Sequence, residues 1–159
     1  MITVKEIIQP DETQSAEIRK LERICKKHDG LQASLNLDAS LNFDKEMKSF
    51  LLLYDGDNLV SVMAIFAPTP NEAELSALTL PQARQKGYFN RLYFRAVDEI
   101  KKHGIKEILF VCDRCSDSGF ETVSAHGAKL DHTEYLPKSD AEESASLLET
   151  AVDYYRKKL

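Results

Sequence analysis

The stretch between residues 74 and 112 places the tightest limit on how this chain can fold. An apolar run suited to a strand, Glu74 to Leu80, precedes a short polar loop and a helical pattern from Tyr88 to His103. A nearly continuous apolar run from Ile105 to Cys112 follows, and it is typical of a strand buried on both faces. Because a helical crossover lets two strands pair in parallel, the sequence predicts a β-loop-α-β unit at the core of an α/β domain.

The loop that joins the first strand to the helix suits the binding of an anion. The first N–H groups of a helix have no intrahelical partner, and the helix dipole adds partial positive charge there. Gly87 allows close backbone approach or a positive φ, and Arg84 and Lys86 add positive charge. The alternative is an ordinary strand-to-helix turn with a basic rim. We expect the loop to hold a pyrophosphate.

This loop resembles motif A of the GNAT N-acetyltransferases, which reads Arg/Gln-x-x-Gly-x-Gly/Ala. Arg84 and Gly87 occupy the first and central positions, whereas Phe89 replaces the last small residue. In that family the loop amides grip the pyrophosphate of acetyl-CoA, and the residues before the loop pair with the pantetheine arm. The resemblance therefore implies acetyl-CoA as co-substrate and a set of residues that bind it: Leu78, Thr79, Leu80, Arg84, Gln85, Lys86, Gly87, Tyr88 and Phe89.

The resemblance also implies transfer of an acetyl group to a small-molecule or peptide amine. A lysine-like amine has a pKa of about 10.4 and arrives protonated, so a base must remove its proton. Glu74 is the candidate base, since the family often has a carboxylate there and partial burial would raise its pKa. Glu72 is the alternative. The family's usual acid, a tyrosine, is replaced by Val123, which leaves Tyr135 as the candidate acid.

The other elements also follow the order of the GNAT fold, a mixed central sheet with helices on both faces. The segment from residue 31 to residue 45 is expected to form a short helix and an ordered loop. Asn42 and Phe43 in this segment either face the acceptor or pack onto the core. The remaining expected elements are strands at 2–8, 49–54, 59–67 and 128–136 and helices at 10–30 and 120–126.

The last residues depart from the family pattern, which places a seventh strand there. Ser139 and Glu142 form a potential capping box before helically spaced apolar residues. We therefore expect a GNAT domain at 1–137, followed by a helical extension at 138–159. Either the sheet lacks its seventh strand, or the chain is one part of a longer protein. The exposed sheet edge would be covered by this helix or by a second copy in a homodimer.

Composition narrows the function and the location. A net charge of −5 argues against nucleic-acid binding and suits a cationic acceptor. The chain shows no signal peptide and no apolar run of about 20 residues, so membrane association is not expected. Three cysteines suggest reduced thiols in the cytoplasm. Cys112 and Cys115 lack the two further ligands of a zinc site, so no metal is expected, and a thiol-redox role is the remote alternative.

Two functions from different classes remain open on the sequence. Glu74 favours an N-acetyltransferase that uses acetyl-CoA. Val123 and the missing seventh strand favour a non-catalytic acyl-CoA-binding or interaction module with a degraded acceptor site.

Overall fold

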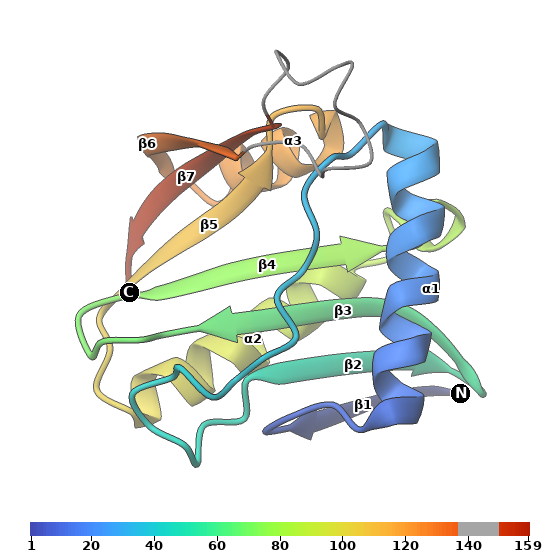
Figure 1. Cartoon of the computed structure of the whole chain (residues 1–159), viewed down its shortest axis with the longest axis horizontal. Helices are drawn as coiled ribbons and strands as arrows, with labels where there is room; N and C mark the ends of the chain where they lie inside the picture. The colour runs from blue at the N-terminus through green and yellow to red at the C-terminus, as the bar shows by residue number, and fades with distance from the viewer. Residues whose placement is uncertain (137–149) are drawn as a thin grey trace.

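A computed structural model describes residues 1–136 and 150–159 of the chain as helices packed on both faces of one sheet (Figure 1). The strands are β1 (Ile2–Ile7), β2 (Phe50–Asp55), β3 (Asn58–Phe66), β4 (Ala73–Thr79), β5 (Glu107–Asp113), β6 (Lys129–Leu136) and β7 (Thr150–Lys158). The helices are α1 (Glu12–Asp29), α2 (Tyr88–Lys102) and α3 (Asp117–Ala125), with a 3₁₀ turn at Pro81–Ala83. No helix of the described residues is long and apolar enough to cross a membrane.

The two longest helices cover opposite faces of the sheet. Figure 1 shows α1 in front of the strands and α2 behind them. Asp11 caps α1 through a reciprocal side-chain and backbone exchange with Gln14, and Gly30 ends the helix at a φ of 72°. Each helix turns an apolar stripe to the sheet, and the fully buried members are Ile18, Leu21, Cys25, Leu92, Ala96 and Ile100.

The strands lie in the order β1-β2-β3-β4-β5-β7-β6, and β4 and β5 are parallel whereas the other neighbours are antiparallel. The predicted meander of β2, β3 and β4 and the predicted crossover through α2 are both confirmed. The parallel pair is short, because β4 and β5 are paired only from Ala73 to Leu75 and from Ile108 to Phe110. Beyond these residues the two strands diverge and open the sheet at their carboxyl ends (Figure 1).

The predicted helical extension is wrong where the structure describes it, since residues 150–158 form the strand β7. This strand lies between β5 and β6, so the sheet has its seventh strand and the segment is part of the same domain. The spacing of Ala151, Val152 and Tyr155 fits a helix or a strand buried on both faces, and pairing with two neighbours decides for the strand. The capping box expected at Ser139 and Glu142 lies outside the described residues.

The segment between α1 and β2 contains no helix, although a short one was predicted there. Asp113 Oδ2 anchors its start by accepting hydrogen bonds from the N–H groups of Gln32 and Ala33, both at 2.8 Å. Asn42 is buried further along, where Nδ2 donates to Ser49 Oγ at 2.7 Å and Oδ1 accepts from a backbone amide at 2.8 Å. Its position favours the packing role over the acceptor-side role.

Candidate functional site

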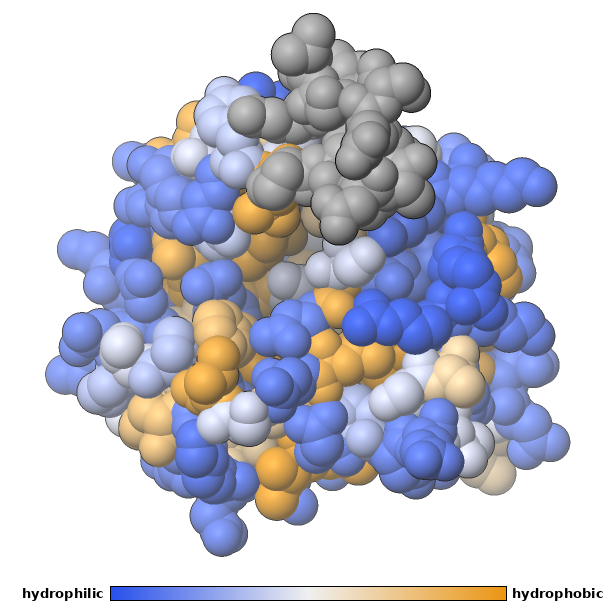
Figure 2. All heavy atoms as spheres, viewed as in Figure 1, coloured by the Kyte–Doolittle hydropathy of each residue, from blue (hydrophilic) through white to orange (hydrophobic). Residues whose placement is uncertain are grey.

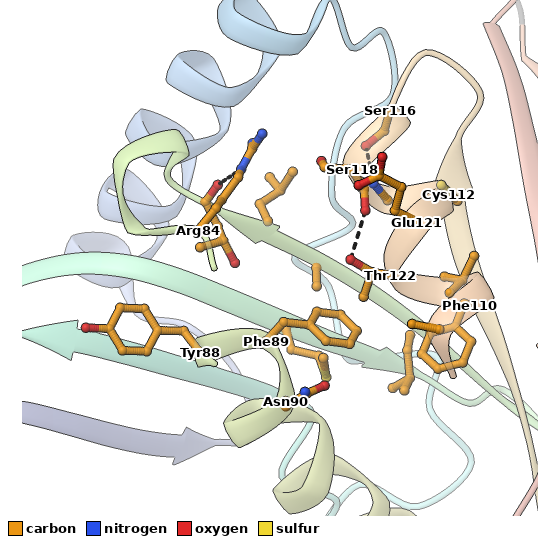
Figure 3. Close-up of a pocket in the computed structure, with 18 of the residues that line it drawn as sticks. Arg84, Tyr88, Phe89, Asn90, Phe110, Cys112, Ser116, Ser118, Glu121 and Thr122 are labelled. Carbon is orange, nitrogen blue, oxygen red and sulfur yellow. Dashed lines mark hydrogen bonds between the residues drawn. The ribbon is translucent and has the colours of Figure 1, made fainter. Parts of the chain in front are cut away.

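A cavity of about 400 Å³ opens where β4 and β5 diverge, between the loop before α2 and the helix α3 (Figure 3). Its wall is apolar through Leu75 and Ala77 of β4, Phe110 of β5 and Val123 of α3. Serine, threonine and carboxylate side chains of α3 and the turn before it form the opposite side: Ser116, Ser118, Glu121 and Thr122. The combination suits a long ligand with an apolar arm and polar groups along it.

The loop at one end of the cavity presents a row of backbone donors. Gln85 has a φ of 62° and is the one non-glycine residue with a positive φ in the described chain, and Gly87 has a φ of 81°. Among the described residues, the N–H groups of 85–90 donate to no backbone carbonyl. Left-handed residues in such a turn draw successive N–H groups together into a concave site for an anion. A Cβ built on Gly87 would meet no heavy atom within 4 Å, so the space beside the loop is open.

Arg84 does not offer its charge to this loop as expected, because its guanidinium pairs with Asp29 at the end of α1. Nη1 lies 3.0 Å from Oδ1 and Nη2 lies 2.6 Å from Oδ2 of the carboxylate. Nε donates to the carbonyl oxygen of Thr79 at 3.0 Å (Figure 3). The hydrogen bonds from Arg84 hold the pKa of the Asp29 carboxyl below its usual value.

Phe89 replaces the small residue of the motif without blocking the loop. Its ring points toward Phe110 (Figure 3) and lies 6.2, 6.5 and 5.7 Å from the rings of Tyr93, Phe110 and His126, respectively. His126 Nε2 lies 2.9 Å from Asn90 Oδ1, which joins the end of α3 to the first turn of α2, and burial lowers the pKa of this imidazole. The aromatic cluster thus accommodates the ring and leaves the Phe89 amide at the loop.

The structure places some of the remaining residues predicted to bind the coenzyme in the cavity lining and others outside it. Leu78, Thr79, Gln85, Gly87 and Tyr88 line the cavity together with Arg84 and Phe89. Lys86 is exposed and lies outside the cavity lining, as does the buried Leu80. The Leu80 amide already donates to the Val60 carbonyl at 2.9 Å, so it is not available to a pantetheine arm.

Glu74 lies on β4 just before the point of divergence, on the face of the sheet that carries α1. Its side chain is half-buried, and burial raises its pKa, with the carboxylates of Glu134 and Glu72 adding to the rise. The predicted rise in pKa therefore has a structural basis, while the role of Glu74 as a base stays a prediction. Glu72 is engaged elsewhere, because its Oε2 lies 2.7 Å from Nη1 of Arg156.

Tyr135 is not brought together with Glu74. Strand register puts Glu74, Leu109 and Arg156 in one row, and alternation along β7 and β6 puts Glu134 on the same face. Tyr135, the next residue along β6, therefore points to the opposite face. Its side chain is 57% exposed, and its ring lies 5.8 Å from the Arg114 guanidinium. The structure thus gives no support to Tyr135 as the acid that partners Glu74.

A different tyrosine, Tyr154 on β7, occupies the face of Glu74, and the sequence reasoning missed it. Its hydroxyl donates to Glu134 Oε2 at 2.9 Å, and its ring stacks on His132 with centroids 4.4 Å apart. Burial and the hydrogen bond to Glu134 raise its pKa. Tyr154 pairs with Val111, the first residue of β5 beyond its pairing with β4. The sequence signal for the position of Tyr154 is the alternation of side chains along a strand, whereas a helix was predicted for this segment.

The surface on this side of the sheet mixes apolar and acidic groups. Figure 2 shows apolar side chains over the middle of the face, with hydrophilic ones around them. Leu109, Val152 and Tyr154 form a small buried cluster beneath Ala33 and Val111. The carboxylates of Glu74 and Glu134 lie beside it, which would suit an amine that carries positive charge.

Comparison by sequence finds no family model and no curated protein that matches this chain. Comparison of structures finds an acetyltransferase of the GNAT family from Streptococcus pneumoniae, at 13% identity and a TM-score of 0.66 with both chains covered completely. The ribosomal-protein-S18-alanine N-acetyltransferase of Escherichia coli is 14% identical, with a TM-score of 0.65 over 99% of this chain and 94% of that one. N-acetylglutamate synthase from Neisseria gonorrhoeae, solved with coenzyme A and N-acetyl-glutamate, is 18% identical with a TM-score of 0.61. This chain is matched completely there but spans 35% of that protein.

These proteins share the arrangement of strands and helices of this chain, although their sequence identity to it is low. The shared features include the mixed seven-stranded sheet and the helices that cover both of its faces. The chain has the fold of the GNAT N-acetyltransferases.

Proposed function

We propose that this chain binds acetyl-CoA between β4 and β5 and transfers its acetyl group to an amine. The observation that carries the proposal is the row of backbone N–H groups at residues 85–90, which have no hydrogen-bond partner among the described residues, at the mouth of a cavity that extends to the diverging strands. The N–H groups fit a pyrophosphate, and the apolar strand side of the cavity fits a pantetheine arm. The structure of the N-acetylglutamate synthase, which contains coenzyme A, supports the same ligand class.

In the proposed reaction the acceptor amine loses a proton to Glu74, directly or through a water molecule. The neutral nitrogen attacks the thioester carbonyl carbon, so a C–N bond forms while the C–S bond breaks and the coenzyme leaves as a thiolate. The second proton lost by the nitrogen passes to this thiolate, directly or through water, which gives the amide and the free thiol. A raised pKa makes Glu74 a stronger base than an exposed glutamate, because catalysis improves as the pKa of the base approaches the working pH. A thiol pKa of about 8.5 lets the thiolate leave without an obligatory acid.

The first test of the proposal is the binding of the donor. Titration calorimetry with acetyl-CoA should give a saturable heat, and the melting temperature should rise because the ligand binds only the folded state. At a ligand concentration 100 times Kd the gain is about 2.7 kcal/mol. A coenzyme A release assay across small amines, aminoglycosides and peptide N-termini then identifies the acceptor. No binding at millimolar acetyl-CoA would refute the proposal.

The second candidate is a non-catalytic acyl-CoA-binding module, and one observation favours it. Val123, at the position where the family often has its acid, is buried and lines the cavity, so no phenol acts from α3. The other argument for this candidate, the missing strand, no longer applies because β7 is present. Acetyl-CoA binding without turnover on any acceptor of the panel would decide for the module.

A further inference from the structure

The Arg84–Asp29 ion pair links the loop before α2 to the end of α1. Its two nitrogen–oxygen distances are 3.0 and 2.6 Å, and the side chains are only 23% and 14% exposed. The Thr79 carbonyl, at the end of β4, accepts hydrogen bonds from Arg84 Nε at 3.0 Å and from Cys25 Sγ at 3.4 Å. Three elements that border the cavity therefore meet at one guanidinium.

The residue that follows Arg84 needs such support. Gln85 has a φ of 62°, and a side chain in the left-handed region is held there only when its surroundings fix the backbone. Arg84 is fixed on both sides, since its amide donates to Pro81 O at 3.3 Å and its guanidinium is engaged through all three nitrogens. The start of the N–H row is thus held by contacts outside the row.

The same contacts reduce the positive charge that Arg84 presents to the loop. The Asp29 carboxylate neutralises the guanidinium and itself lines the cavity, so the net charge of the pair next to the loop is zero. If Arg84 bound phosphate directly, removing the Asp29 carboxylate would strengthen coenzyme binding. If Arg84 instead positions the loop, removing that carboxylate would weaken coenzyme binding. The two roles therefore predict opposite effects when the carboxylate is removed.

We propose that Asp29 and Arg84 are positioning residues that hold the N–H groups of residues 85–90 in place for the pyrophosphate of the coenzyme. The inference rests on the proposed binding of acetyl-CoA in this cleft. It makes the end of α1 part of the donor site, although α1 contributes no group to the row of N–H donors. Loss of either partner disorders the loop and weakens coenzyme binding.

The test uses Asp29→Asn, which removes the charge and keeps the size of the side chain. Coenzyme A binding measured by calorimetry should weaken by about ten- to a hundredfold, the range for losing a charge-assisted contact. Asp29→Asn combined with Arg84→Gln should bind no more weakly than Arg84→Gln alone, because one unit is being broken. Tighter or unchanged binding by Asp29→Asn would overturn the proposal.

Glu6→Gln is the matched control, because it removes the same charge from the Arg95–Glu6 pair, 3.2 Å apart, which joins β1 to α2. It should leave the affinity unchanged. Asp29→Glu keeps the charge and should restore most of the affinity, so it also serves if Asp29→Asn folds poorly. Equal losses of coenzyme A affinity in Glu6→Gln and Asp29→Asn would show that the effect comes from the change in net charge alone, and would overturn the proposal.

A second measurement needs no coenzyme and separates this inference from the proposed function. Backbone ¹⁵N order parameters of residues 85–90 in the free protein should fall from about 0.85 to below about 0.6 in Asp29→Asn and stay high in Glu6→Gln. If the parent protein fails to bind coenzyme A but these values fall, the function is wrong and the positioning role stands. If the values do not change, the positioning role is wrong whether or not the coenzyme binds.

Discussion

Replacing Gly87 with valine distinguishes the stability of the loop from its ability to bind the coenzyme. Gly87 has a φ of 81°, and a β-branched residue at such a φ costs roughly 1–3 kcal/mol of stability. The new Cβ meets no heavy atom within 4 Å apart from those of the adjacent residues, so the side chain enters open space at the loop. If the pyrophosphate occupies that space, the variant folds but excludes the ligand.

The size of the effect follows from the contacts that are lost. A hydrogen bond to a charged group contributes about 1.5–3 kcal/mol, so the loss of two costs roughly 3–6 kcal/mol. Each 1.4 kcal/mol is about a factor of ten in Kd, which makes the expected loss of affinity at least about a hundredfold. Calorimetry with coenzyme A measures the affinity, and a thermal melt of the same sample measures the stability.

Gly104, just past the other end of α2, provides a matched control. It has a φ of 77°, and a Cβ there would also meet nothing within 4 Å. Gly104→Val should therefore lower the melting temperature about as much as Gly87→Val while leaving the affinity for coenzyme A unchanged. Equal affinities in the two variants would show that the pyrophosphate does not approach Gly87, and the reasoning about the loop would be refuted.

Four further predictions concern the acceptor side and the ion pair. Glu74→Gln should bind coenzyme A normally and lose turnover most at neutral pH; parental rates between about pH 6 and 9 would exclude Glu74 as the base. Because the folded-state pKa of Glu74 is raised, its stabilising effect is lost as the pH rises through that pKa, so Glu74→Gln should melt higher at neutral pH. Tyr154→Phe should slow turnover more than Tyr135→Phe, and the reverse order would reinstate Tyr135. The depressed pKa of Asp29 stabilises the fold above the unfolded-state value of about 3.9, and this contribution is lost as the pH falls through the folded-state pKa. Urea melts should therefore separate Asp29→Asn from the parent at pH 7 and bring the two together in acid.

The sequence predicted the part of the fold whose signals are local. The strand, the loop with Gly87, the amphipathic α2 and the apolar β5 follow one another directly, and each carries its own periodicity or end signal. The loop that we propose to bind the coenzyme was predicted for the same reason. The bounds of α2 differ from the expected ones by a single residue, because His103 is the C-cap.

The features that sequence reasoning missed depend on contacts between distant residues. Arg84 and Asp29 are 55 positions apart, and the sequence of the loop does not indicate that its arginine pairs with a distant carboxylate. Which tyrosine lies on the face of Glu74 depends on strand register, since one step along β6 moves a side chain to the other face. The apolar spacing in 150–158 fits two structures, and only the neighbouring strands decide between them.

The position of β7 has a consequence for how the chain folds. This strand follows β6 in the sequence but separates β6 from β5, so the later part of the sheet cannot assemble in chain order. Until β7 arrives, β5 presents an unpaired edge to the solvent and β6 has no neighbour to pair with among the described strands. Closing such long-range pairings is slow, and the exposed edge invites association with other chains. During synthesis, the half of the sheet that carries Tyr154 is therefore expected to need shielding from aggregation until the last described residues emerge.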